Sequence, residues 1–181
     1  LREELKEQLG MDVATAAEYV GELDRPELTF ATCPLPVRRK QSFKSIVLEA
    51  WAAAKSAAPE WAFAGRVLIY TTTAVQARYT AMQLSEAGVP AGAYCSRGMT
   101  ADERASSLAA WDTGAFRVMV ATKAFGQGID RPDVSAVFHF GLPQDIDEWW
   151  QENGRAGRGR NARGFALTFL HKRFVVDRLR L

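Results

Sequence analysis

The stretch Gln151-Glu-Asn-Gly-Arg-Ala-Gly-Arg-Gly-Arg160 places a glutamine and two arginines at helical spacing. Gln151, Arg155 and Arg158 are separated by four and three residues, so in a helix all three side chains project from one face. Two neighbouring guanidiniums repel each other, and burying them without an anion is costly. A planar, permanently charged fork suits phosphate oxygens. The segment therefore predicts a phosphate-binding site, with a solvated basic helix end as the alternative.

A second block, at 120–134, reads VATKAFGQGIDRPDV and combines small residues with a carboxylate. Gly126 and Gly128 can adopt backbone angles closed to other residues and bring backbone amides near a phosphate. Asp130 offers a carboxylate that can accept a hydrogen bond from a hydroxyl group. Thr122 directly follows an apolar run, and ligands of open parallel sheets bind at the carboxyl ends of strands. A helix-capping threonine and a turn aspartate remain the alternatives for two of these residues.

In this order and at this separation, the two blocks resemble motifs V and VI of superfamily 2 nucleic-acid helicases. The wording AT-x-AFG-x-GID-x-P-D-V followed by Q-E-x-GRAGR is most similar to the RecQ family of DNA helicases. The resemblance implies that Arg158 is an arginine finger that reaches the γ-phosphate of ATP, with Arg155 as its partner. It implies that Gln151 senses the same phosphate or its attacking water, and that Gly128 and Asp130 contact the nucleotide. Phosphoryl transfer suits this set, because it needs positioning and charge neutralisation.

The resemblance also implies contacts with the DNA backbone. The candidate residues share a position at or shortly after the end of an apolar run: Thr71, Thr72, Arg97, Thr122 and Lys123. The threonines at 71–73 can equally provide the N-cap of a helix that begins at residue 74. Cys95 stands where relatives usually have a histidine, which puts that residue's contact in doubt. Arg97 looks inserted in the same loop and is an added candidate for a phosphate contact.

The expected substrates are ATP and single-stranded or partly duplex DNA, with 3′ to 5′ polarity by resemblance and roles in DNA repair and recombination. The chain has no GxxxxGK[ST] phosphate loop and no Asp-Glu pair in a DEAH-like context to hold Mg²⁺. In relatives a separate N-terminal RecA-like lobe supplies both, so that lobe is an expected partner. We therefore expect the 181-residue chain alone to be inactive as an ATP hydrolase, and we expect no metal site within it.

Length and composition are typical of one globular domain, since the 181 residues are 48% hydrophobic. No apolar run approaches the roughly 18 residues of a membrane-spanning helix. Cys33 and Cys95 have no metal-like spacing and are expected to be free thiols in a reducing compartment. The expected location is intracellular, and the nucleus if the source is eukaryotic. Residues 151–181 carry eight Lys and Arg against two acids, and this basic end favours a phosphate-bearing partner.

These candidate residues need a scaffold, which the pattern of apolar runs predicts. Continuous apolar runs are typical of strands covered on both faces, hence of a parallel sheet. The runs lie at 28–31, 67–70, 91–94, 118–121, 137–140 and 165–169. Helical patterns lie at 43–54, 74–87, 101–112, 145–156 and 172–181. Together they predict an α/β fold, a doubly wound, mainly parallel sheet with helices on both faces, similar to a RecA-like helicase lobe. Such a sheet is expected to bring Thr122, Asp130 and Arg158 near one edge.

The chain is expected to divide at residue 27. Residues 1–27 begin with leucine rather than methionine and resemble the end of a junction from a missing N-terminal RecA-like lobe. Residues 28–181 are expected to form the helicase C-terminal RecA-like domain. Within it, His139 is expected to be a satisfied core histidine, and the tryptophans at 149–150 are expected to pack rather than stack on bases.

Two other functional classes remain open. A lobe of an RNA helicase or of a double-stranded DNA translocase belongs to the same superfamily, but those usually carry ARGxD or a GxGxNL-type motif V, unlike AFGQGID here. A non-catalytic RecA-like module that binds nucleic acid or a protein partner is the second class. The intact Arg155 and Arg158 speak against a loss of catalysis.

Overall fold

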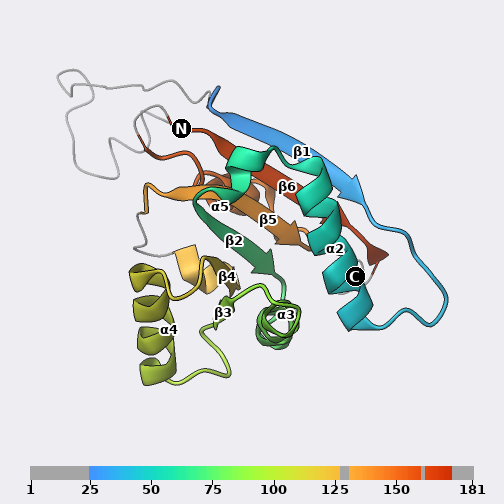
Figure 1. Ribbon diagram of the computed structural model, residues 1–181, viewed down its shortest axis with the longest axis horizontal. Helices are drawn as coiled ribbons and strands as arrows, with labels where there is room; N and C mark the ends of the chain where they lie inside the picture. Colours follow the sequence, from blue (N-terminus) through green and yellow to red (C-terminus); the bar gives the residue numbers. More distant parts are fainter. Residues whose placement is uncertain (1–24, 127–130, 160–161, 173–181) are drawn as a thin grey trace, which may run out of the picture.

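The chain folds around one six-stranded sheet, seen in a computed structural model that describes residues 25–126, 131–159 and 162–172. The strands are β1 (Leu28–Pro34), β2 (Arg66–Thr71), β3 (Ala91–Tyr94), β4 (Val118–Ala121), β5 (Val134–Phe140) and β6 (Gly164–Leu170). Their order across the sheet is β1-β6-β5-β2-β4-β3, and every neighbouring pair runs parallel (Figure 1). The predicted α/β fold with a mainly parallel sheet is therefore confirmed.

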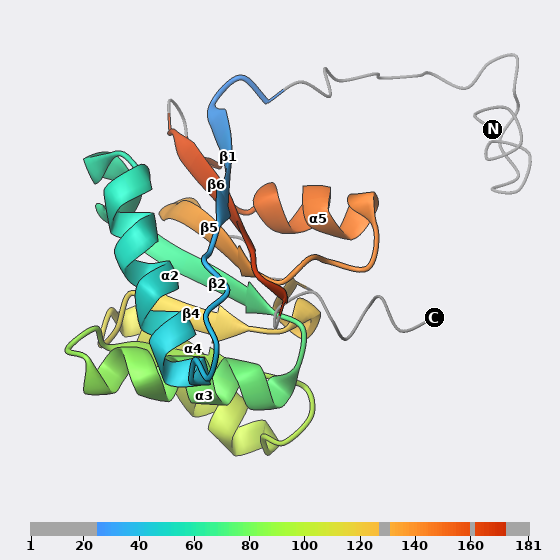
Figure 2. The same ribbon diagram turned by 90° about the vertical axis from the view of Figure 1, so that its right-hand side faces the viewer.

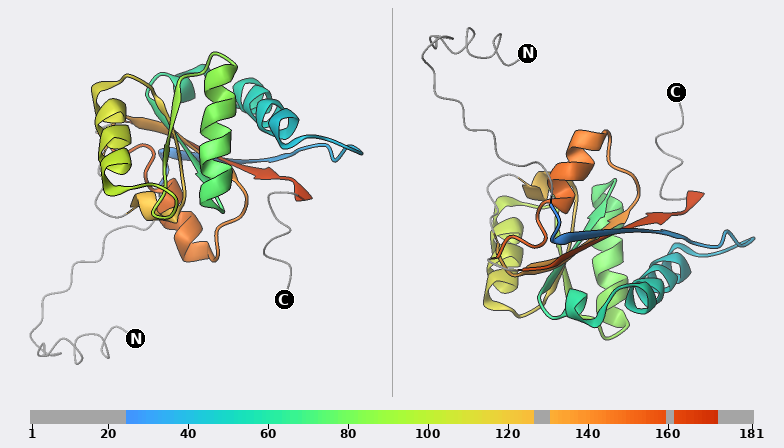
Figure 3. Two further views of the ribbon diagram at one scale, coloured as in Figure 1. Left: turned by 90° about the horizontal axis from the view of Figure 1, so that it is seen from below. Right: turned by 90° about the horizontal axis from the view of Figure 1, so that it is seen from above.

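Helices connect the strands and cover both faces of the sheet. They are α2 (Phe43–Ala57), α3 (Ala74–Glu86), α4 (Ala101–Thr113) and α5 (Ile146–Asn153), with short 3-10 helices η1 (Glu60–Phe63) and η2 (Lys123–Gly126). The helices α2 and α3 lie on one side of the sheet and α5 lies on the other (Figure 2, Figure 3). Parallel strands require this arrangement, because each connection must return over a face of the sheet.

Each of these α-helices begins at a polar residue whose side chain accepts a hydrogen bond from a backbone N–H of the first turn. The capping residues are Ser42, Thr73, Thr100 and Asp145. Such a cap satisfies one of the backbone donors that a helix start leaves without a partner, and it contributes about 1 kcal/mol. Thr73 caps α3, so the capping role left open for the threonines at 71–73 belongs to the last of them.

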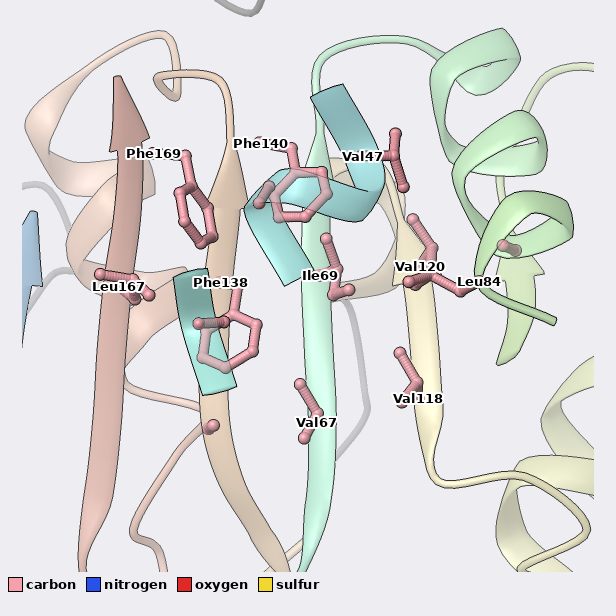
Figure 4. Packing of buried hydrophobic residues seen from close by; sticks show 14 of the residues in the cluster. Val47, Val67, Ile69, Leu84, Val118, Val120, Phe138, Phe140, Leu167 and Phe169 are labelled. Atoms are coloured by element: carbon pink, nitrogen blue, oxygen red, sulfur yellow. The ribbon is translucent and has the colours of Figure 1, made fainter. Parts of the chain in front are cut away.

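The larger apolar core lies between the sheet and the layer formed by α2 and α3. Phe138 of β5 is fully buried in it, with its ring centroid 6.3 Å from Trp51, 5.9 Å from Phe63 and 6.4 Å from Phe169. Figure 4 shows Phe138 and Phe169 on adjacent strands, with Ile69 on the next strand of the same face. This core holds β2, β5 and β6 in register and so fixes where their carboxyl ends lie.

A second apolar cluster lies on the opposite face of the sheet. Trp111 of α4 and Phe125 of η2 are fully buried there, with ring centroids 5.4 Å apart. The guanidiniums of Arg66 and Arg131 lie 5.4 and 5.8 Å from the centroid of the Trp111 ring. Arg131 also pairs with Asp112 at 3.1 Å. These contacts tie the chain on the carboxyl side of the GQGID block to α4.

Most of the segments predicted for the two ends of the chain cannot be compared with the structure. The predicted helix at 172–181 and residues 1–24 of the predicted junction lie outside the described residues. The junction's last residues are described: Arg25 pairs with Glu27, and its guanidinium donates to the carbonyl of Ala156 at 3.2 Å. No helix within the described ranges is long and apolar enough to cross a membrane.

Candidate functional site

A cavity of about 470 Å³ opens at the carboxyl ends of β2, β4 and β5. Its walls come from the residues that follow these strands, from the loop after β3 and from the inner side of α5. The cavity is lined by all five residues that the sequence marked for DNA-backbone contact: Thr71, Thr72, Arg97, Thr122 and Lys123. Because parallel strands end at the same edge of a sheet, residues from distant parts of the chain meet here.

The threonine wall of the cavity is held by side-chain hydrogen bonds. Thr71 is buried, and its hydroxyl donates to the carbonyl of Thr73 at 3.2 Å. The hydroxyl of Thr72 donates to Oε1 of Gln76, in the first turn of α3, at 2.6 Å. At the end of the neighbouring strand β4, the backbone N–H of Thr122 donates to the carbonyl of Tyr94 at 3.3 Å. These bonds fix the directions of the wall residues before any ligand arrives.

Two cations border the cavity. Arg97 lies exposed in the loop between β3 and α4, and Lys123 lies exposed at the start of η2. The Nζ atom of Lys123 is 2.9 Å from Oε1 of Gln144 and 4.0 Å from Oε1 of Glu148. Ion pairs between exposed side chains contribute little, so Lys123 can exchange these partners for a phosphate at small cost. The cavity rim therefore offers hydroxyls and cations together.

The buried side of the cavity is formed by His139, Glu152 and Tyr70. His139 is buried in the core, as predicted, and its Nε2 lies 3.0 Å from Oε2 of Glu152. Its Nδ1 has no hydrogen-bond partner among the described residues, so only one of the two ring nitrogens is satisfied. Tyr70 is the register partner of His139 in the neighbouring strand, and the two rings stack with centroids 5.6 Å apart. Burial raises the pKa of the Tyr70 phenol far above its usual value, and the nearby Glu152 raises it further. The phenol therefore stays neutral at physiological pH.

Sequence reasoning missed several residues of this cavity. Gln144 and Glu148 lie between β5 and the middle of α5, and Glu152 lies one helical turn further on. The available signal was the run of polar residues after the apolar run at 137–140. Tyr70 could not be recognised in this way, because in the sequence it is simply the last residue of the apolar run at 67–70.

The helix α5 ends at Asn153, before the first of the two arginines. The predicted helix at 145–156 is therefore three residues shorter at its end, and the condition for Gln151, Arg155 and Arg158 to share one helical face is not met. Gly154 caps the helix, and Gly157 has a φ of +68°, which ends the helical path. Glycine is a poor helix former and takes left-handed backbone angles without strain.

The arginine segment lies at the opposite end of α5 from the cavity mouth. The backbone N–H of Gly157 donates to the carbonyl of Val134, the first residue of β5, at 3.0 Å. Thr122 instead follows the last residue of β4. The backbone of the arginine segment thus lies toward the start of β5, while the charge of Arg158 still acts on Tyr70 near the strand ends. That Thr122, Asp130 and Arg158 lie near one edge stays a prediction. The remaining nucleotide candidates, Gly128 and Asp130, lie outside the described residues.

The arginine side chains have surroundings that fit an anion. Arg158 is exposed, and its Nε donates to the carbonyl of Gly154 at 2.8 Å, which anchors one side of the guanidinium. Arg155 is partly buried beside Tyr70, and its charge acts on that phenol. Gln151 is exposed on the last turn of α5. Planar guanidiniums are suited to binding phosphate oxygens, so the proximity of these two residues in the sequence keeps the predicted phosphate site open.

The paired tryptophans pack within the domain, as predicted. Nε1 of Trp149 donates to the hydroxyl of Thr168 at 3.2 Å. Trp150 is 41% exposed, and its ring stacks on Phe30 with centroids 5.7 Å apart. Both tryptophans therefore pack α5 against the sheet, Trp149 against β6 and Trp150 against β1.

Cys95 turns away from the cavity. It is completely buried, its Sγ lies 3.8 Å from the carbonyl oxygen of Ala74, and burial raises the pKa of its thiol. The neighbouring Ser96 and Arg97 line the cavity. This loop therefore contributes the hydroxyl of Ser96 and the guanidinium of Arg97 to the cavity lining, whereas Cys95 is part of the core.

Among known protein families, the helicase conserved C-terminal domain matches this chain over residues 52–160. The chain is 42% identical over 108 residues to the ATP-dependent helicase SGS1 of Saccharomyces cerevisiae, covering 60% of this chain and 7% of that protein. It is 40% identical over 91 residues to the RecQ-like DNA helicase blm-1 of Caenorhabditis elegans, covering 50% of this chain and 9% of that protein. The chain thus spans a small part of the length of these relatives.

A solved structure shares the fold. The yeast DEAD-box splicing factor Prp28 matches with a TM-score of 0.67 over 84% of this chain and 31% of that chain. The sequence identity is 18%, so the likeness concerns the arrangement of strands and helices alone. It agrees with the RecA-like fold predicted from the sequence.

Proposed function

The chain belongs to the helicase conserved C-terminal domain family and resembles its RecQ-type members, and from that premise we propose that it is the second motor lobe of an ATP-dependent DNA helicase. The cavity at the strand ends would contact the backbone of a DNA single strand. The arginine segment after α5 would face ATP bound between this lobe and a separate N-terminal lobe. That other lobe would hold Mg²⁺, and the direction of movement would be 3′ to 5′.

The observation that carries the proposal is the convergence of Thr71, Thr72, Arg97, Thr122 and Lys123 on one cavity. A nucleic-acid strand presents a phosphate at every step, and hydroxyls and cations are the groups that bind phosphate oxygens. Backbone contacts of this kind position a strand without reading its sequence. A motor that moves along DNA needs such contacts.

The arginine segment supports the nucleotide side of the proposal. Arg158 is exposed in the glycine-rich segment after α5, and Arg155 lies three residues before it in the sequence. Planar guanidiniums stabilise the charge that develops on a transferring phosphoryl group. In this proposal Arg158 is the arginine finger, Arg155 and Gln151 assist it, and Gly128 and Asp130 contact the nucleotide.

The 181-residue chain by itself is expected to hydrolyse no ATP above background, with or without single-stranded DNA. The sequence has no phosphate loop to hold the β- and γ-phosphates, and an arginine finger cannot replace one. A phosphate-release assay on the purified chain measures this, with the natural full-length protein as the positive control. Sustained turnover by the chain alone would contradict the two-lobe proposal.

Arg97→Gln is expected to weaken binding to single-stranded oligothymidylate. Removing one phosphate contact should reduce the slope of log K against log salt concentration by about 0.7. Fluorescence anisotropy across a salt series on the full-length protein measures the slope. Lys55→Gln is the matched control, because it removes one exposed positive charge from α2, on the other side of the sheet. Equal slopes for Arg97→Gln and the control would remove Arg97 from the DNA contact.

A further inference from the structure

The polar pair His139–Glu152 is buried where the sheet meets α5. The two side chains are 1% and 10% exposed, and their nearest atoms are 3.0 Å apart. The other described ion pairs are more open, as in Lys44–Glu86, where both side chains are half exposed. Burying polar groups is costly even when they are paired, and apolar residues of similar size often stabilise a fold as well. The pair is therefore a candidate for a role beyond stability.

The pair connects the cavity to the arginine segment through an unbroken series of contacts. Tyr70 precedes Thr71 in β2, and its ring stacks on His139 at 5.6 Å with an interplanar angle of 19°. Tyr70, His139 and Glu152 all line the cavity. On the other side, the carbonyl of Glu152 accepts the backbone N–H of Arg155 at 3.2 Å. One residue thus joins the cavity wall to the first arginine.

A second interaction follows the same path. The positive charge of Arg155 acts on the Tyr70 phenol. Tyr70 therefore lines the cavity, stacks on His139 and lies within electrostatic range of Arg155. Glu152 and Tyr70 thus border both the cavity and the first arginine, which gives a short physical route for coupling between the two sites.

We propose that Tyr70, His139 and Glu152 are positioning residues that couple a DNA backbone in the cavity to the placement of Arg155. The proposal rests on the proposed function, since it takes the cavity as the DNA site and the arginine segment as the nucleotide site. A strand that fills the cavity meets the His139–Glu152 pair and Tyr70 at its buried side. Glu152 then transmits the change to Arg155 through the backbone and through Tyr70.

The experiment measures coupling by binding alone, in the natural full-length protein. The affinity for fluorescein-labelled oligothymidylate is determined with and without a non-hydrolysable ATP analogue. In the wild type the ratio of the two affinities should differ from one by about fivefold or more, and the analogue's affinity must change by the same factor when DNA is added. Glu152→Gln and His139→Asn should bring the ratio to within about twofold of one, well below that usual range of coupling.

The unfolding temperature separates coupling from a structural role. It should stay near the wild-type value in Glu152→Gln and His139→Asn, because both substitutions keep a hydrogen-bonding side chain at the position. DNA affinity without nucleotide is measured beside it, since both residues line the cavity and only the ratio of the two affinities reports the coupling. Tyr70→Phe keeps the stacked ring, removes one oxygen atom, and should lower the ratio in the same direction. Glu86→Gln, which removes the acid of the exposed Lys44–Glu86 pair, is the control and should keep the wild-type ratio.

Three results would overturn the proposal. An unchanged ratio in Glu152→Gln or Tyr70→Phe would show that the coupling does not pass through these residues. A loss of DNA affinity without nucleotide, together with a lower unfolding temperature, would make the pair a purely structural one. If the wild-type protein binds both DNA and the ATP analogue, but its DNA affinity is the same with and without the analogue, then the two sites are not coupled. The proposed function would remain intact in that case. A wild type that binds no DNA would instead contradict the proposed function itself.

Discussion

Arg158→Ala in the full-length protein should lower the rate of ATP hydrolysis at least a hundred-fold. The guanidinium of Arg158 is exposed and anchored to Gly154, and its proposed target exists only when ATP is bound and the two lobes close. Its contribution should therefore appear in turnover rather than in strand affinity. Arginine fingers contribute roughly 10³ to 10⁵ in rate in related phosphoryl transfer, and a hundred-fold loss corresponds to about 2.7 kcal/mol.

Steady-state kcat and DNA affinity without nucleotide are the two measurements for this variant, and the affinity should stay within a few-fold. Arg158→Lys should recover little activity, since it keeps the charge and loses the planar fork. Arg163→Ala, at an exposed arginine just before β6, is the matched control and should leave kcat near the wild-type value. Normal turnover combined with lost DNA binding would make the arginine segment a DNA-binding surface instead.

Phe138→Ala should lower the free energy of unfolding of the chain by about 3–5 kcal/mol. The Phe138 ring is fully buried and meets the rings of Trp51, Phe63 and Phe169, which come from α2, η1 and β6. Deleting the ring leaves a cavity that three rigid aromatic neighbours cannot fill. For a domain of this size the unfolding temperature should fall by about 10 °C.

Urea denaturation followed by circular dichroism measures the loss for Phe138→Ala. Val75→Ala is the control, because Val75 is 78% exposed on α3 and its substitution should change the free energy of unfolding by less than about 0.5 kcal/mol. Phe138→Leu should lie between the two, since it keeps most of the buried volume. A loss below about 1 kcal/mol for Phe138→Ala would mean that the core relaxes around the site.

The strands were predictable because their signal is local. Residues 67–70 and 118–121 are continuous apolar runs, and both form central strands with helices on each face. A strand buried on both faces is a continuous apolar run without alternating polar residues. Such a run can be recognised in the sequence without knowing which strands lie beside it. The family motifs added the five cavity residues, because each follows such a run and parallel strands end at one edge.

The end of α5 and the role of Tyr70 could not be read from the sequence in the same way. Arg155 and Arg158 have helical spacing, but the two intervening glycines decide the backbone, and their effect depends on the bond from Gly157 to Val134. Tyr70 faces His139 only because β2 and β5 are neighbours, although β3 and β4 lie between them in the chain. A contact that depends on the order of the strands in the sheet cannot be recognised from the residues around it in the sequence.

The pairing of β1 with β6 has a consequence for biosynthesis. Leu28 pairs with Gly164, so the first described strand takes its place at the edge of the sheet beside the last one. At typical rates of synthesis, on the order of ten seconds separate the emergence of the two strands from the ribosome. During that time β1 has no partner strand, and its unpaired backbone groups and Phe30 are open to contact with other chains. The last step of folding is therefore the closure of this edge, and newly made chains cut short before Gly164 are the ones most exposed to aggregation and to capture by chaperones.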